Sequence, residues 1–124
     1  MPGPRLEWEW WKDADVKKEL GLTEDKARDI DRIHQDRVRL MKPFQDEYEK
    51  QREELNRLAA ERTVDEATFA FQVTRVEALF SKLRESRTIM LYRISRKLSL
   101  EQNTKLREIR DRRGRSGRGG GSAR

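Results

Sequence analysis

Apolar residues recur at helical spacing over most of the chain. Between Thr23 and about Ala60 they fall on one stripe at about 100° per residue, in a run that has no glycine and one proline, Pro43. The stripe continues in phase beyond Pro43, which predicts a bend in one long helix rather than its end. Its members are Ile30, Ile33, Leu40, Met41, Phe44, Tyr48, Leu55, Leu58 and Ala59.

A second long helix is predicted to run to about Lys97. Thr63 and Glu66 match a capping box, with Asp65 as a rival cap. The connection across residues 61–65 is short, so the two long helices form an antiparallel hairpin. The seam of the second helix has nearly heptad spacing: Phe69, Val73, Val76, Phe80, Leu83, Arg87, Met90 and Ile94.

Two shorter helices flank the hairpin. Residues 13–20 read as a short helix, capped by Asp13 and ended by Gly21. A capping box formed by Ser99 and Gln102 opens the last helix, which we expect to fray near Arg113–Gly114.

These elements predict an all-α fold of four helices: a long antiparallel helical hairpin with short N- and C-terminal helices. Charged residues are 42% of the 124 residues and hydrophobic residues 34%, so the core must be thin. A lone hairpin buries one stripe on each helix, and we therefore expect a homodimer. We expect three segments: an irregular Trp-rich lead-in (1–12), a helical domain (13–113) and a disordered tail (114–124).

The charge of the chain is concentrated at its C-terminal end. Residues 110–124 hold six arginines and one aspartate and carry +5 of the net charge of +6. This arginine- and glycine-rich tail resembles segments that bind RNA through charge, and the alternative is a solubilising tail. The helical body is nearly neutral, so a nucleic-acid partner is expected of the tail only.

Composition excludes several kinds of site. The chain has no cysteine, so disulfides and thiolate metal sites are excluded, and its one histidine, His34, cannot build a multi-histidine site. A histidine on the flank of a helix is the favoured interpretation of His34. No apolar run approaches the length of a membrane span. No catalytic motif or paired-carboxylate site is present, and we expect neither an enzyme nor a cofactor.

The most informative feature is a second stripe on the second long helix. Phe71 and Ile89 lie about 180° from Phe80, and Lys82 shares their face. Packing against a dimer partner or another part of the chain would explain the stripe, and so would a surface that binds client proteins. Trp8, Trp10 and Trp11 would cover the end of the hairpin, or anchor a partner.

Two short motifs point to a family. Leu20-Gly21-Leu22-Thr23-Glu24-Asp25-Lys26 and Leu98-Ser99-Leu100-Glu101-Gln102 resemble the paired LTxxQ motifs of the Spy/CpxP family of bacterial periplasmic proteins. Each motif opens a helix, as in that family. The Met41-Lys42-Pro43 break is also similar, and the Trp10-Trp11-Lys12-Asp13 lead-in resembles that of related periplasmic heavy-metal sensors. Lys26 and Ser99 depart from the motif, and the ZraP- and CnrX-type sensors use several histidines.

The resemblance implies a cradle-shaped homodimer that acts as an ATP-independent periplasmic chaperone for unfolded or misfolded envelope proteins. The alternative is a stress- or heavy-metal-sensing accessory protein that regulates a membrane signalling partner. The N-terminus lacks the pattern of a signal peptide, so we expect either a cytosolic protein or a chain that begins after a removed segment, and the resemblance favours the second, a mature form. The residues we expect to bind clients are Arg37, Met41, Phe71, Lys82, Arg87, Ile89, Tyr92 and Arg96.

Overall fold

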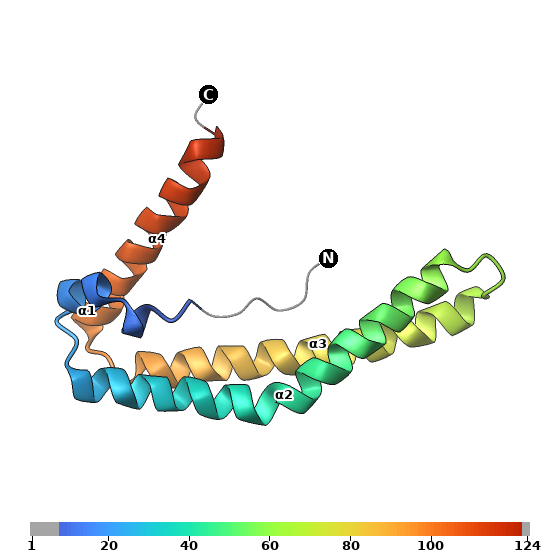
Figure 1. Cartoon of the computed structure of the whole chain (residues 1–124), viewed down its shortest axis with the longest axis horizontal. Helices are drawn as coiled ribbons and strands as arrows, with labels where there is room; N and C mark the ends of the chain where they lie inside the picture. The colour runs from blue at the N-terminus through green and yellow to red at the C-terminus, as the bar shows by residue number, and fades with distance from the viewer. Residues whose placement is uncertain (1–7, 123–124) are drawn as a thin grey trace. The chain divides into compact units, whose positions relative to one another are not determined.

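The computed structural model describes the backbone of residues 8–122 and the side chains of residues 8–114. These residues form a 3₁₀ turn and four helices (Figure 1). The elements are η1 (Trp10–Lys12), α1 (Ala14–Leu20), α2 (Glu24–Ala60), α3 (Glu66–Ser95) and α4 (Leu100–Ser122). No strand occurs in this part of the chain, which confirms the all-α, four-helix prediction. Residues 1–7 of the predicted lead-in lie outside the described residues.

The chain divides into two compact units. The first, here the hairpin unit, contains residues 34–91, which are most of α2 and α3. The second, here the terminal unit, contains described residues 8–33 and 92–122, which are η1, α1, α4 and the adjoining ends of α2 and α3. Each unit is described by itself below.

The hairpin unit is built around one apolar seam. Tyr48, Val76 and Leu83 are buried at its centre, and Phe80 lies against Tyr48 with ring centroids 5.7 Å apart. The predicted stripe of α2 is largely confirmed, but Leu40, which is 65% exposed, and Ala59, which is also exposed, do not belong to it. Further members of the seam are half-buried: Met41, Phe44, Leu55 and Leu79.

A buried pair of glutamines crosses this seam. Gln72 Nε2 donates to the backbone oxygen of Gln51 at 2.8 Å and to its side-chain oxygen at 2.9 Å. Gln51 is 8% exposed and Gln72 4% exposed, and each takes a place that an apolar side chain could fill. Because a buried amide without a partner is costly, this pairing favours one register of α2 against α3.

Local chemistry sets the bend and the turn of the hairpin. Pro43 lies inside α2, which bends along its length (Figure 1) and continues to Ala60, as the in-phase stripe predicts. The cap of α3 is Asp65, whose Oδ1 accepts the amide of Thr68 at 3.1 Å. The prediction of Thr63 as the cap is wrong and the rival cap, Asp65, is the one observed, because α3 begins at Glu66 and Asp65 is the residue directly before it.

In the terminal unit, α1 has the predicted cap and stop. Asp13 Oδ1 accepts the amides of Asp15 at 3.0 Å and Val16 at 3.3 Å. Gly21 ends the helix in the left-handed conformation with φ 66°, which glycine adopts without the steric cost that a side chain imposes. Both features were predicted from the sequence and are confirmed.

The two LTxxQ-like motifs meet each other in this unit. Lys26 Nζ, at the last position of the first motif, donates to the Lys97 carbonyl at 2.8 Å. Gln102 Nε2, at the last position of the second motif, donates to the Leu20 carbonyl at 3.0 Å. Each motif therefore satisfies a backbone oxygen at the beginning of the other motif or directly before it, and we call this pair of contacts the reciprocal clasp. Lysine in place of glutamine at position 26 keeps a donor there.

Gln102 also completes the predicted capping box. Its side-chain Oε1 accepts a hydrogen bond from the backbone amide of Ser99 at 3.0 Å, and the backbone amide of Gln102 donates to Ser99 Oγ at 3.1 Å. The helix that follows, α4, extends to Ser122. The prediction that it frays near Arg113–Gly114 is wrong for the backbone.

Ion pairs hold α4 to α1. Arg112 reaches both carboxylate oxygens of Glu19, at 3.0 and 2.9 Å. Arg113 donates to Asp13 Oδ2 at 2.9 Å and lies over the Trp8 ring at 4.5 Å. Asp13 thus caps α1 with one oxygen and pairs with α4 through the other.

Replacing Gln102 by alanine should lower the free energy of unfolding by about 1–2 kcal/mol, because the capping box and one arm of the clasp are lost together. Urea unfolding followed by far-UV circular dichroism measures this. Gln102→Glu separates the two roles, since it can still accept from Ser99 but cannot donate to Leu20. An effect of Gln102→Ala no larger than that of the neighbouring Thr104→Ala would contradict the assignment.

Acid should weaken the contact between Asp13 and its donors. Hydrogen bonding from the Val16 amide, with Arg113 contributing, holds the pKa of Asp13 below its ordinary value of 3.8. The stability that these contacts supply is therefore complete above about pH 4 and is lost as the pH falls below it. Melting temperatures of wild type and Asp13→Asn should differ at pH 7, and the difference should shrink as the pH falls below the ordinary pKa of 3.8. A pH-independent difference would show that Asp13 is not the titrating group.

Candidate client-binding surface

The face of α3 that points away from the seam carries a second regular series of residues. From Phe71 onward its members follow spacings of four and three residues, the same pattern as the buried seam. They are Phe71, Arg75, Ala78, Lys82, Glu85 and Ile89, and the series continues into the terminal unit with Tyr92 and Arg96. Every one of these residues is exposed. We call the six residues within the hairpin unit the outer stripe.

The apolar members of the outer stripe are large and unusually exposed. Phe71 is 66% exposed and Ile89 48% exposed. They are five helical turns apart, so both point in the same direction at about 27 Å separation along α3. The prediction that the seam cannot cover these residues is confirmed. No described residue of the hairpin unit buries either side chain.

Basic side chains lie beside the aromatic rings of this unit. The guanidinium of Arg75 lies 5.8 Å from the centre of the Phe71 ring. Lys82 Nζ lies 4.8 Å from the centre of the Phe44 ring, so this lysine leans from the outer stripe toward α2. Such cation–π contacts keep the positive charge at the surface and near the apolar groups. Within the outer stripe only Glu85 is acidic.

The structure distributes the predicted client-binding residues over different environments. Phe71, Lys82 and Ile89 share the outer stripe. Tyr92 is 62% exposed, and Arg96 lies over its ring at 5.8 Å, but both belong to the terminal unit. They continue the register of the stripe along α3.

The other three predicted residues, Arg37, Met41 and Arg87, are half-buried. Arg37 Nη2 donates to the Leu83 carbonyl at 3.2 Å, which links α2 to α3. Met41 packs against the hairpin core. These positions suit a structural role, and their participation in client binding stays a prediction. Arg75 was missed, although its position four residues after Phe71 on the same stripe was visible in the sequence.

A separate cluster of charges lies in the terminal unit. Lys12 Nζ approaches Glu9 Oε1 at 2.7 Å and Asp31 Oδ1 at 3.5 Å. Trp11 Nε1 donates to the same Asp31 oxygen at 3.0 Å. Trp10 and Trp11 are each 2% exposed and meet edge to face. The cluster therefore combines two carboxylates, one ammonium and a buried indole, and we call it the Lys12 cluster.

Carboxylates are side chains from which a divalent metal site could be built in the terminal unit, and Glu9 and Asp31 offer them. Asp31 and His34 are one turn apart on α2. His34 is 7% exposed, so the expectation of a histidine on the helix flank underestimates its burial. His34 is the first residue of the hairpin unit, and Asp31 belongs to the terminal unit.

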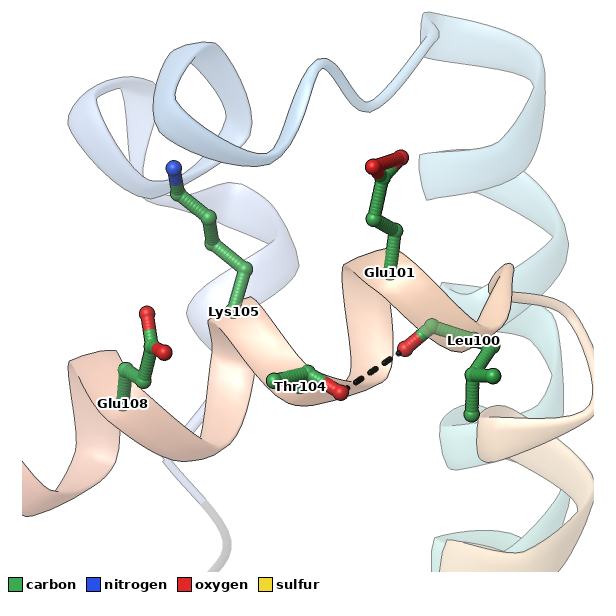
Figure 2. Close-up of a pocket in the computed structure, with 5 residues that line it drawn as sticks. All are labelled: Leu100, Glu101, Thr104, Lys105 and Glu108. Carbon is green, nitrogen blue, oxygen red and sulfur yellow. Dashed lines mark hydrogen bonds between the residues drawn. The ribbon is translucent and has the colours of Figure 1, made fainter.

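A shallow hollow on α4 is lined by residues of that helix alone (Figure 2). The lining residues are Leu100, Glu101, Thr104, Lys105 and Glu108, and its volume is about 420 Å³. Thr104 Oγ1 donates back to the Leu100 carbonyl at 3.1 Å. Leu100 is 84% exposed, so the hollow is an open surface rather than an enclosed pocket. It does not provide the partly dry environment that catalysis needs.

The fold and these surfaces define a helical-hairpin protein with an exposed amphiphilic face. None of the described helices has an apolar stretch long enough to cross a bilayer. Residues 17–116 match the heavy-metal resistance family, and the chain belongs to that family. Comparison with curated proteins and with solved structures gave no match.

Proposed function

We propose that this protein is an ATP-independent chaperone of the periplasm that holds non-native proteins on the outer stripe of α3. The observation that carries the proposal is the exposure of Phe71 and Ile89 on one face, with Arg75 and Lys82 between them. Scattered apolar and basic groups along a helix suit extended, partly unfolded chains, which expose both apolar and acidic side chains.

The physical properties of such a surface favour weak and general binding. Positive charge attracts acidic segments at long range and speeds their encounter. The apolar groups then remove part of their surface from water, at about 25 cal/mol per Å². Because the stripe forms no deep pocket, contacts can rearrange, and one surface can accept many sequences.

The periplasmic location is part of this proposal, and the resemblance to the Spy/CpxP family supports it. The two LTxxQ-like motifs of this chain form the reciprocal clasp. The residues that carry the resemblance therefore have a common structural role. Membership of the heavy-metal resistance family agrees with a role under envelope stress.

The double variant Phe71→Ser/Ile89→Ser should need about threefold or more protein to suppress aggregation of a chemically denatured client diluted without ATP. Two large apolar contacts are lost, each of which contributes about 1 kcal/mol or more to binding. Light scattering of the client measures the effect. Leu100→Ser is the matched control, because it removes an exposed apolar side chain from α4.

Far-UV circular dichroism must show that the double variant keeps its helices. Equal suppression by wild type and double variant, with both folded, would contradict the assignment to the outer stripe. A comparable loss in Leu100→Ser would also contradict it, since any exposed apolar residue would then serve. Suppression that disappears only when residues 110–124 are deleted would assign the activity to the arginine-rich end instead.

A homodimer is part of the same proposal, because a lone two-helix hairpin buries only one stripe of each helix and so has a thin core. We expect sedimentation equilibrium to give twice the chain mass of 14.8 kDa at micromolar concentration. A single-chain mass up to 100 μM would exclude the dimer as the state that holds clients.

A second function is a stress- or heavy-metal-sensing accessory protein that regulates a membrane signalling partner. The family match favours it. It requires that the chain bind a metal ion, and the Lys12 cluster bears directly on that requirement.

A further inference from the structure

Membership of the heavy-metal resistance family raises the question of whether these residues fit a metal ion. Oxygen ligands from Glu9 and Asp31 suit a divalent cation such as Zn²⁺ or Ni²⁺ by type. Both carboxylates belong to the terminal unit and come together on one side chain, Lys12. Their present partner is therefore a cation that the chain itself supplies.

The ammonium of Lys12 already occupies the position between the two carboxylates. The ammonium contacts Glu9 at 2.7 Å and Asp31 at 3.5 Å, while the Trp11 indole uses the same oxygen of Asp31 at 3.0 Å. A metal ion bound by both carboxylates would stand near the position of Nζ. Two cations cannot share that position, because their repulsion at a few ångströms is strong.

Lys12 carries a positive charge at neutral pH, because the ordinary pKa of a lysine amine is about 10.4. The side chain therefore remains an ammonium at any pH near neutrality. Metal binding must either displace this ammonium from both carboxylates or force it to lose its proton.

We propose that Lys12 acts as a built-in cation that occupies the Glu9–Asp31 carboxylates and keeps divalent metal ions from binding them. The two carboxylates are then a structural ion cluster that fixes η1 against the start of α2. Glu9 and Asp31 therefore do not fit the bound metal ion that membership of a heavy-metal resistance family suggests, because Lys12 occupies both carboxylates.

Isothermal titration with ZnCl₂ and NiCl₂ tests the proposal on the full chain. Wild type should show no stoichiometric binding that depends on Asp31, so wild type and Asp31→Asn should give the same titration. Lys12→Ala should bind at least about tenfold more tightly than wild type, because the competing charge is gone. The gain should disappear in Lys12→Ala/Asp31→Asn.

Lys17→Ala is the matched control. Lys17 pairs with Glu24 at 3.1 Å in the same unit, so this variant also removes one ammonium from a carboxylate but leaves the Lys12 cluster intact. It should titrate like wild type. An equal gain in Lys17→Ala would reduce the effect to a general change of charge and overturn the specific role of Lys12.

Two further outcomes would overturn the proposal. Stoichiometric binding by wild type that is lost in Asp31→Asn would show that a metal displaces Lys12 readily. No gain in Lys12→Ala, with its helices intact by circular dichroism, would show that the ammonium is not what keeps the metal out. Lys12 lies outside the outer stripe, so Lys12→Ala should suppress client aggregation as wild type does. The test of metal exclusion is therefore independent of the test of chaperone activity.

Discussion

The reciprocal clasp is the contact on which the terminal unit depends. Four chain segments meet there: the end of α1, the start of α2, the end of α3 and the start of α4. Lys26 and Gln102 each donate to a carbonyl left without a helical partner where another helix ends. The clasp works because each donor lies at a fixed distance along the chain from the start of a helix. Thr23 Oγ1 accepts the Lys26 amide at 3.2 Å and caps α2, as Ser99 caps α4, and the two capped starts position both donors. A short motif used twice thus satisfies backbone groups that are far apart in sequence.

In the hairpin unit, the arrangement of the helices depends on α3, which carries two series of apolar residues on opposite faces. One heptad-like series packs into the seam with Tyr48, and a second series of the same spacing remains exposed. The seam is kept in register by the buried Gln51–Gln72 pair as well as by apolar packing. A helix with apolar groups on two sides has only a weak preference for which side it buries. The hydrogen-bonded pair of buried glutamines determines which face of α3 packs against α2. The outer stripe is then free to carry bulky residues without competing for the core.

Much of the fold could be predicted because its signals are local. Asp13, Gly21 and the Ser99–Gln102 box act within one or two turns, and the structure confirms each of them. Predictions failed where the outcome depends on contacts across the hairpin or on competing caps: Leu40 is exposed, and Asp65 caps α3 in place of Thr63. The outer stripe was visible as a periodic pattern. The Lys12 cluster was not, because Lys12 and Asp31 are distant in the chain and only folding brings them together.

The position of the tryptophans has a consequence for how the protein can be observed. All three, Trp8, Trp10 and Trp11, belong to the terminal unit, and the hairpin unit has none. Intrinsic fluorescence excited at the indole band therefore reports on one unit alone, while far-UV dichroism reports on both. With Trp10 and Trp11 buried and Trp8 beneath Arg113, the emission spectrum is a natural label for the terminal unit. Comparing the two signals during unfolding would reveal whether the units lose structure together or one after the other.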